Sequence, residues 1–357
     1  MNAASGPSDV GRQGRLRVGV VGLGSWGLEH LRAWMAIPGV QVVSVCDLDE
    51  RLCERVGEAF GIPRRFGAAT DMASDGDLDV VSIVSGESDR FETATPFFDA
   101  GVHALVEKPL ALDLATAERL VAAAQRAGVI LMTGHVLRFD ARFVTVKQRV
   151  DAGAVGEIRS VYARRLNLAS AQERYRRAHP ALMAQIHDID LACWYFGDGP
   201  TAVRAYEVPV RHDGGAALPT VLWSLLEFPR GIAVLEHAWV LPEAGGIWLE
   251  SETELIGADG VLRVRTPGDA IELLAAGRNE RPDPAVAAIA NGHPAIALKE
   301  QLSYFASCVI DRRPPQRLTT DDGLRALAAA FAVVEAARSG TKVQLTALAS
   351  TGKTNPA

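Results

Sequence analysis

The chain has 357 residues, more than one hydrophobic core normally holds, so we expect two domains. A composition of 48% hydrophobic and 22% charged residues is that of an ordinary globular protein. The formal charge of −6, from 37 basic and 43 acidic side chains, gives no electrostatic reason to bind nucleic acid or an anionic membrane, and we expect neither partner.

The cysteines and the chain ends indicate the compartment. Four cysteines occur without a CxxC pair or a His/Cys metal spacing: Cys46, Cys53, Cys193 and Cys308. We therefore expect reduced thiols in a cytoplasmic protein, with no disulfide and no bound metal. Residues 1–14 are polar, lack the apolar core of a signal peptide and are expected to be a disordered tail. Residues 346–357 are expected to be a flexible tail.

Residues 15–138 alternate between short apolar runs and segments with helical spacing. The apolar runs are typical of strands and lie at residues 15–24, 40–49, 79–85, 103–109 and 129–136. Helical patterns lie between them at residues 25–37, 51–60, 92–101 and 114–128. This alternation predicts repeated βα units with right-handed crossovers around a parallel sheet.

The pattern changes after residue 157. Longer segments with partial alternation occupy residues 158–168, 220–228, 231–241, 247–258 and 260–266. They predict one mainly antiparallel sheet in a second, α+β domain, residues 139–345, after a first α/β domain of residues 15–138. An Ala-rich helix at residues 321–340 ends the ordered part, either within the second domain or packed back on the first.

The first apolar run is followed by the glycine pattern Gly22-x-Gly24-x-x-Gly27, which opens a helix. In such a pattern the first glycine permits a tight turn and the second lets a pyrophosphate approach the amides of the helix N-terminus. The third glycine allows close packing of helix on strand. The pattern therefore predicts a dinucleotide site.

An acidic residue, Asp47, follows the second apolar run. Its carboxylate is expected to accept hydrogen bonds from the adenosine ribose and to repel a 2′-phosphate, so NAD is expected in preference to NADP. Arg51 lies near enough in the sequence to leave NADP open. The alternative is that Asp47 or Asp49 only caps the following helix.

A second motif, Glu107-Lys108-Pro109, follows the run at residues 103–109, where ligand sites of open α/β sheets lie. Proline keeps Lys108 out of helical geometry and permits a cis bond. Beside a nicotinamide, the Lys108 ammonium can hydrogen-bond the oxygen that exchanges a proton during hydride transfer. The alternative is a surface salt bridge between Glu107 and an arginine.

Taken together, these residues resemble the Gfo/Idh/MocA oxidoreductases, named for glucose-fructose oxidoreductase and inositol dehydrogenase, from residue 16 to about residue 345. The motifs that carry the resemblance are GLGSWG with Asp47, AGVHALVEKPLA (100–111), GHVLRFD (134–140), IHDIDLACWYFG (186–197) and the segment 312–340.

The resemblance implies an N-terminal Rossmann domain and a C-terminal domain with an open sheet, whose outer face forms homodimers or homotetramers. It also implies a nicotinamide between the domains, and a lysine, Lys108, that commonly precedes a cis proline. The residues expected at the cofactor are Gly22, Gly24, Ser25, Trp26, Gly27, Asp47, Ser85, Glu107 and Lys108.

The resemblance assigns His187 as the acid/base histidine of a helix from Pro180 to Tyr195. Many members carry an Asp four residues before this histidine, on the same face of the helix, where this chain has Met183. A thioether cannot orient an imidazole through a charged hydrogen bond, so the relay is simpler here or uses another acid. Asp190 is the candidate acid, and Asp188 is a second. A buried histidine without catalytic work is the alternative for His187.

Other positions complete the expected site. His135 is implied to lie beside the nicotinamide or the substrate. Ser85-Gly86 stands where the family often reads Thr-Pro, and Arg90 where a His is frequent. The basic segment 162–180 supplies candidate substrate contacts, Arg165, Asn167 and Tyr175, or else is a solvated loop. The remaining histidines are expected to be structural or exposed: His30, His103, His212, His237 and His293.

These residues predict an NAD-dependent oxidoreductase acting on a secondary hydroxyl of a sugar, a cyclitol or a nucleotide-linked sugar. Lys108 would polarise the oxygen and His187 would exchange the proton. One alternative is an enzyme with resident NAD that works by transient oxidation, in glycosidic cleavage or internal redox. Another is a dinucleotide-binding sensor that has lost catalysis.

Overall fold

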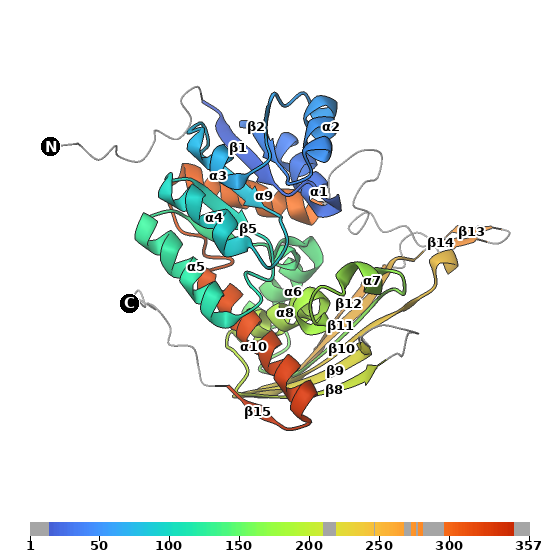
Figure 1. Cartoon of the computed structure of the whole chain (residues 1–357). Helices are drawn as coiled ribbons and strands as arrows, with labels where there is room; N and C mark the ends of the chain where they lie inside the picture. Colours follow the sequence, from blue (N-terminus) through green and yellow to red (C-terminus); the bar gives the residue numbers. More distant parts are fainter. Residues whose placement is uncertain are drawn as a thin grey trace. The chain divides into compact units, whose positions relative to one another are not determined.

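A computed structural model describes residues 14–209, 219–245, 247–267, 273–275, 278–280 and 296–345. The expected tails, 1–14 and 346–357, lie outside the described residues except for Gly14, as do His212 and His293. The chain divides into two compact units, each traced in Figure 1. The first unit comprises Met1–Asp140 with Ala288–Thr320, and the second comprises Ala141–Ala287 with Asp321–Ala357.

The first unit contains a six-stranded sheet in the order β3-β2-β1-β4-β5-β6, with every pair parallel. Its strands are β1 (Leu16–Val21), β2 (Val40–Cys46), β3 (Arg64–Phe66), β4 (Val80–Ile83), β5 (His103–Val106) and β6 (Leu131–Thr133). This order confirms the predicted Rossmann-type sheet, and it reverses direction between β1 and β4. Short β3 carries too few residues to show a period, and the sequence did not predict it.

Helices connect these strands and complete the core of the first unit. They are α1 (Ser25–Met35), α2 (Glu50–Phe60), α3 (Ala69–Ser74), α4 (Arg90–Asp99), α5 (Leu114–Ala127), η1 (Val136–Phe139) and α9 (Ile296–Ile310). Asp49 caps α2 by accepting from the Leu52 amide at 3.0 Å, and Asp113 caps α5 by accepting from the Thr116 amide at 2.7 Å.

Helix α9 departs from the expected domain boundaries. The sequence placed it in one continuous second domain, 139–345, but residues 288–320 belong to the first unit. Leu302 and Phe305 of α9 are fully buried in one cluster with Leu31 and Trp34 of α1. The physical reason is that α9 covers apolar surface of α1, which lies much earlier in the chain and gives no local signal.

The second unit is built on a seven-stranded sheet in the order β12-β11-β7-β10-β9-β8-β15. Its strands are β7 (Ile158–Leu168), β8 (Ala202–Pro209), β9 (Pro219–Phe228), β10 (Gly231–Leu241), β11 (Leu249–Gly257), β12 (Val261–Thr266) and β15 (Val343–Gln344). Only β7 and β10 pair in parallel, so the expected mainly antiparallel sheet is confirmed. A separate hairpin joins β13 (Leu273–Ala275) to β14 (Arg278–Glu280).

Helical segments cover one face of this sheet, as Figure 1 shows for α6 and α8. The segments of the second unit are α6 (Ala141–Asp151), α7 (Ala171–Tyr175), η2 (Ala181–Gln185), α8 (Ile186–Phe196), η3 (Glu243–Gly245) and α10 (Thr320–Ser339), the last beginning at the unit boundary. Contacts of α8 with β7 and β10 define the covered face. The last helix, from Asp321 onward, belongs to the second unit.

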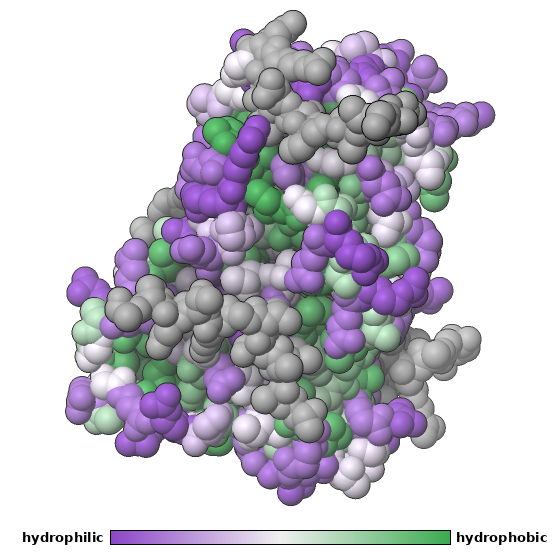
Figure 2. Space-filling model, turned by 90° about the vertical axis from the view of Figure 1, so that its left-hand side faces the viewer, coloured by the Kyte–Doolittle hydropathy of each residue, from purple (hydrophilic) through white to green (hydrophobic). Residues whose placement is uncertain are grey.

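The opposite face of the seven-stranded sheet carries exposed apolar side chains. Tyr206 pairs with Trp223 across β8 and β9, and Ile256 pairs with Val261 across β11 and β12. Figure 2 shows another side of the molecule, the left-hand side of Figure 1, where hydrophilic and hydrophobic residues are interspersed. Among the described residues, no helix is long and apolar enough to span a membrane.

Candidate active site

The expected cofactor residues of the first unit gather at one edge of the parallel sheet. Gly22 follows β1, Asp47 follows β2, Ser85 lies beyond β4, Lys108 lies beyond β5 and His135 lies beyond β6. All of these positions are at the carboxyl ends of parallel strands, and these ends lie along one edge of the sheet. The strand order reverses between β1 and β4, and the residues lie on both sides of that point. Ligands of open α/β sheets bind at that point.

The glycine loop has the geometry that its pattern predicts. Gly22 has φ of 88°, and a Cβ on it would lie 2.7 Å from the Ser85 amide nitrogen. A Cβ on Gly27 would lie 1.8 Å from the Gly22 carbonyl oxygen, so only glycine lets α1 approach the end of β1 this closely. Gly22 and Gly27 are therefore required by the backbone geometry of the loop itself.

Gly24 serves a different purpose. It is the N-cap of α1, and a Cβ built on it would meet no atom within 4 Å. Unlike α2 and α5, helix α1 has no side-chain cap, and its first turn contains no acidic residue. The exposed residues Gly24 and Ser25 thus present the amides of a helix N-terminus to an anion, which fits a pyrophosphate.

Asp47 ties the glycine loop to the end of β2. Its Oδ2 accepts a hydrogen bond from the Leu23 amide at 2.7 Å, and its Oδ1 accepts one from the Asp49 amide at 2.9 Å. Of the two aspartates offered as helix caps, Asp49 caps α2 and Asp47 holds the loop. A carboxylate has about four acceptor sites, so Asp47 keeps capacity for ribose hydroxyls, and this role stays a prediction.

The Ser85 hydroxyl is a further polar group at this edge of the sheet. Its Oγ atom is buried and has no hydrogen-bond partner among the described residues. Buried hydroxyls are normally bonded, so an orphan beside Gly22 fits a group that arrives with the cofactor. The open α1 terminus, Asp47 and Ser85 together fit a dinucleotide.

The turn Glu107-Lys108-Pro109 has the cis bond between Lys108 and Pro109 that the resemblance implied. Lys108 is half-buried, while Glu107 is only 3% exposed. The Glu107 Oε2 atom accepts a hydrogen bond from the Lys108 amide at 3.1 Å. A Cβ on Gly134 would lie 2.4 Å from the Glu107 carboxylate, so the glycine after β6 makes room for this acid.

A buried chain of hydrogen bonds supports the Glu107 carboxylate. Because a carboxylate only accepts, His30 donates through Nε2 to Glu107 Oε1, at 3.2 Å. His30 Nδ1 is hydrogen-bonded to Ser82 Oγ at 3.3 Å, and Ser82 Oγ accepts from the Trp34 indole at 2.8 Å. The sequence assigned His30 no such contact, because its partners lie 52 and 77 residues away.

The charge state of Glu107 follows from this environment. Burial raises the pKa of its carboxyl, but the His30 hydrogen bond, the Lys108 charge and the Trp26 side chain outweigh burial and hold that pKa below its usual value. Trp26 also packs edge-on against His30, with ring centroids 5.8 Å apart. Glu107 is therefore an ionised acid next to Lys108 and not the surface salt bridge offered as the alternative.

His187 is the second residue of α8, in a segment that is not uniformly α-helical. The sequence predicted one helix from residue 180 to residue 195, but Ala181–Gln185 forms a π-helical turn before α8. A turn of a π-helix holds more residues than a turn of an α-helix, so the helix is wider just before His187. Nothing in the local sequence indicates the wider turn.

The π-turn is anchored to the sheet by Gln185, whose side chain is fully buried. Its Nε2 donates to the carbonyls of Leu222 and Leu235, at 3.4 and 3.3 Å, and its Oε1 accepts from Ser224 Oγ at 2.7 Å. These bonds join the turn to β9 and β10. His187, two residues later, is half-exposed between buried neighbours.

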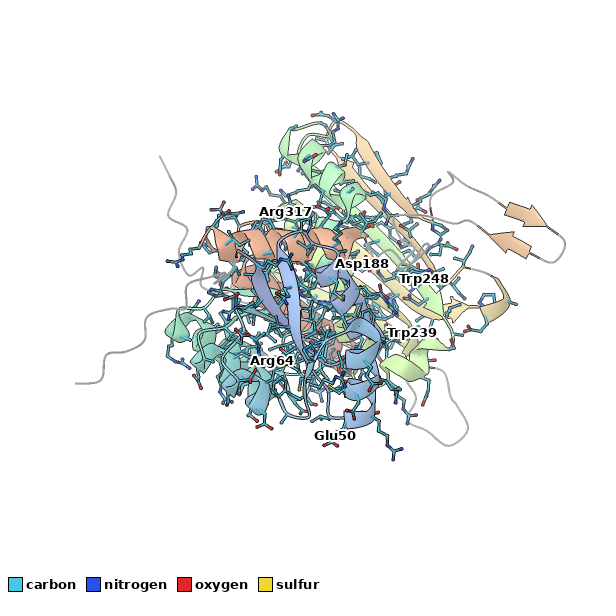
Figure 3. All side chains as sticks on the ribbon, turned by 90° about the horizontal axis from the view of Figure 1, so that it is seen from above. Glu50, Arg64, Asp188, Trp239, Trp248 and Arg317 are labelled. Atoms are coloured by element: carbon cyan, nitrogen blue, oxygen red, sulfur yellow. The ribbon has the colours of Figure 1, made fainter. Side chains whose placement is uncertain are left out.

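The acids near His187 are both buried. Asp188, which is labelled in Figure 3, accepts a two-pronged ion pair from Arg165 of β7, with both N–O distances 2.8 Å. Asp188 is therefore committed to Arg165. Asp190 is 1% exposed, and its support of His187 stays a prediction.

The basic segment 162–180 is not a loop but consists mostly of β7 and α7. Arg164 pairs with Glu250, Arg176 with Glu173, and His179 with Glu207. Because side chains alternate along a strand, Arg165 faces the helices and Arg164 faces away from them. Asn167 and Tyr175 are half-exposed, and their substrate contacts, with that of Arg165, stay predictions.

Two family profiles match this chain. The first, an oxidoreductase family with a NAD-binding Rossmann fold, matches residues 16–135, and the second, the GFO/IDH/MocA C-terminal domain, matches residues 143–263. The D-apiose dehydrogenase of Paraburkholderia graminis is 30% identical over 256 residues, covering 70% of this chain and 68% of that protein. The chain belongs to the Gfo/Idh/MocA oxidoreductases. This membership confirms the expected enzyme class and the expected cofactor, NAD.

Other relatives of this Gfo/Idh/MocA chain share the same class. The inositol 2-dehydrogenase of Salmonella typhimurium is 28% identical over 194 residues, which cover 54% of this chain and 57% of that protein. Among solved structures, a probable dehydrogenase from Thermotoga maritima matches with a TM-score of 0.81 at 23% identity, covering 92% of this chain and 99% of that one. A scyllo-inositol dehydrogenase from Lactobacillus casei with bound NAD(H) and scyllo-inositol has a TM-score of 0.79 at 23% identity, covering 92% of this chain and 99% of that one. These likenesses establish the fold.

Lys108 and His187 belong to different units of the chain. Each unit presents its own residues as described, and the meeting of Lys108 and His187 at one substrate stays a prediction.

Proposed function

We propose that this protein is an NAD-dependent dehydrogenase of polyhydroxylated rings, which oxidises a secondary hydroxyl of a cyclitol, a sugar or a nucleotide-linked sugar. The observation that carries the proposal is the Lys108 turn, which lies at the ligand edge of a dinucleotide-binding sheet and rests on the ionised Glu107. Relatives named for inositol and apiose support the substrate class.

When bound, NAD supplies the hydride acceptor of the reaction. The ammonium of Lys108 donates a hydrogen bond to the carbinol oxygen and stabilises the negative charge that develops there as the hydroxyl loses its proton. A ring nitrogen of His187 accepts that proton. Such positioned acid–base groups contribute about 10² to 10⁴-fold to a rate.

We propose that Asp190 supports His187 and that His135 borders the reacting groups. Asn167, Tyr175 and Arg165 are the proposed substrate contacts of the second unit. Arg165 also binds Asp188 through Nε and Nη2, so the ion pair and the proposed substrate contact involve the same side chain.

We further propose that the open face of the seven-stranded sheet forms a homodimer or homotetramer. Exposed Tyr206, Trp223 and Ile232 support this face as an interface, because large apolar side chains gathered on one surface mark association sites. Light scattering on wild type and Trp223→Glu tests it, since a charge at the interface should lower the mass of the particle.

The proposed location is the cytoplasm. It is supported by the four cysteines, which are buried thiols that form no disulfide. Burial raises the pKa of the Cys46 thiol to about 12, which keeps that side chain neutral and unreactive.

The experiment that tests the function follows nicotinamide absorbance with NAD or NADP and a panel of cyclitols, sugars and nucleotide-sugars. Lys108→Met should lower kcat on the best substrate by about 100-fold or more while NADH still binds. Lys147→Met is the matched control, because Lys147 pairs with Asp151 on α6 of the second unit. Its kcat should equal that of wild type.

Two other results would replace the proposed function. NAD retained through purification, without net turnover of any substrate, indicates transient oxidation by a resident cofactor. NADH that exchanges freely and supports no turnover in the wild type indicates a dinucleotide sensor. Met183 and Gly86, which stand where the family often has Asp and Pro, would then be explained by the loss of catalysis.

A further inference from the structure

Arg90, the first residue of α4, has its side chain buried beneath the Lys108 turn. The residue is 3% exposed. Its Nη1 donates to the Glu107 carbonyl at 2.6 Å and to the Pro109 carbonyl, and its Nη2 donates to the Ser85 carbonyl at 3.2 Å. One guanidinium therefore binds the backbone on both sides of Lys108 and the loop beyond β4.

The three carbonyls belong to two different loops. Glu107 and Pro109 flank Lys108 beyond β5, whereas Ser85 lies beyond the neighbouring strand β4. Ser85 is also the residue whose amide lies against Gly22 of the glycine loop. The Arg90 side chain thus connects the lysine turn to the segment that borders the dinucleotide loop.

A second charged side chain, that of Glu107, binds the backbone N–H of Lys108 in the same turn. The Glu107 carboxylate accepts the Lys108 amide at 3.1 Å and is itself held by His30 at 3.2 Å. The amide of Lys108 and the carbonyls of its two neighbours are consequently all bonded to buried charged side chains. Hydrogen bonds to charged groups are the strong ones in proteins, and they leave this backbone little freedom.

The loop held by Arg90 contains a conformationally permissive residue, because Gly86 follows Ser85. A guanidinium has five N–H donors in a planar fork, enough to bind carbonyls from two loops at once. The Arg90 bond to the Ser85 carbonyl restrains the loop that Gly86 would otherwise loosen.

We propose that Arg90 is a positioning residue for Lys108: it locks the lysine turn and the Ser85-Gly86 loop into one rigid unit. The proposal rests on the proposed catalytic role of Lys108. A displacement of about 1 Å in a reacting group can cost about 100-fold in rate, so loss of this lock should lower kcat.

The test compares Arg90→Met and Arg90→Lys with wild type and with Arg119→Met. Arg119 is a matched control, because its guanidinium packs over the Phe91 ring of α4, with the Cζ atom 4.3 Å from the ring centroid. We expect Arg90→Met to lower kcat by about 10 to 100-fold, with KM for the polyol and Kd for NADH changed by less than about threefold. Arg90→Lys, and guanidinium ion added to Arg90→Met, should each restore part of kcat, while Arg119→Met keeps the wild-type kcat.

The primary deuterium isotope effect on polyol oxidation adds a readout that a merely structural role does not move. It should increase in Arg90→Met, because misplacement of Lys108 makes hydride transfer slower than product release. Arg90→Met with wild-type kcat overturns the proposal, as does an equal loss in Arg119→Met or a loss of NADH binding in parallel with kcat. If Arg90→Met does not fold, Arg90→Lys decides: an unchanged isotope effect and kcat overturn the proposal.

Failure of the proposed function is distinguishable from failure of this inference. Wild type without turnover on any substrate removes the function. The lock is then measured by amine labelling of Lys108 followed by mass spectrometry, with Lys147 as the internal reference. An altered Lys108 labelling rate in Arg90→Met, but not in Arg119→Met, supports the lock, and equal rates overturn it.

Discussion

The carboxylate of Asp47 accepts the backbone N–H of Leu23 at 2.7 Å, so the acid at the end of β2 holds the middle of the glycine loop. The same side chain is therefore a structural part of the loop and the group expected to face the adenosine ribose. Its neighbour Asp49 performs a separate task, the capping of α2.

Replacement of Asp47 should change the choice of cofactor. Asp47→Asn removes the charge that repels a 2′-phosphate and weakens the ribose contact, so KM for NAD should rise about 10-fold and KM for NADP should fall. Steady-state kinetics with both cofactors measure the ratio. The control, Asp49→Ala, should cost about 1 kcal/mol of stability and leave the ratio unchanged. An unchanged ratio in Asp47→Asn would refute the ribose role.

The second and third glycines of the loop should respond differently to a methyl group. Gly24→Ala places its Cβ in open space, so the melting temperature of the protein should stay that of wild type, but the methyl obstructs a pyrophosphate and NADH affinity should fall at least about 10-fold. Gly27→Ala forces a Cβ against the Gly22 carbonyl and should destabilise the fold by about 1–3 kcal/mol even without cofactor. Thermal melts with and without NADH separate the two effects. Wild-type NADH binding by Gly24→Ala would contradict the assignment of this terminus.

His237 of β10 predicts a pH dependence of stability. Its ring is fully buried, neither ring nitrogen has a side-chain partner among the described residues, and it packs edge-on against Trp239 at 4.5 Å. Burial, with the nearby Arg165 charge, lowers the pKa of His237 from 6.5 to about 3. Because the unfolded chain takes up this proton first, protonation of His237 costs no stability above pH 6.5, and the free energy of unfolding decreases as the pH falls from 6.5 toward 3.

The measurement is the free energy of unfolding of wild type and His237→Leu at pH 7.5 and pH 5. Wild type should lose about 2 kcal/mol more than the variant over this interval, since each pH unit below the unfolded pKa costs about 1.4 kcal/mol. At pH 7.5 the variant should be at least as stable as wild type, because a buried polar ring has been removed. Equal losses in both proteins would show that His237 does not carry the effect.

Gln185 should control the placement of His187. Gln185→Leu removes three hydrogen bonds from the π-turn and leaves Ser224 and two carbonyls without them, so stability should fall by about 1–3 kcal/mol. Polyol oxidation should slow, while NADH binding, which depends on the first unit, should persist. Gln148→Leu, on an exposed position of α6, is the control and should behave as wild type. Unchanged kcat in Gln185→Leu would mean that the turn does not position His187.

Two predictions from the sequence were wrong in detail, and both failures have the same cause. The helix from residue 180 to residue 195 begins instead as a π-turn, and residues 288–320 join the first unit rather than the second. In each case the deciding partner lies far along the chain: β9 and β10 for Gln185, and α1 for α9. Local periodicity carries no record of such partners.

Local sequence was enough to predict the parallel and antiparallel sheets, the glycine loop with Asp47, and the lysine turn, because strand periodicity and turn chemistry depend on residues close in the chain. Two other features required the folded chain: His30 donates to Glu107 across 77 residues, and Arg90 binds three carbonyls from two loops. Such contacts depend on which strands become neighbours in the sheet. The hydrogen-bond partners of buried charged side chains can therefore be identified only from the tertiary structure, which shows which strands are neighbours.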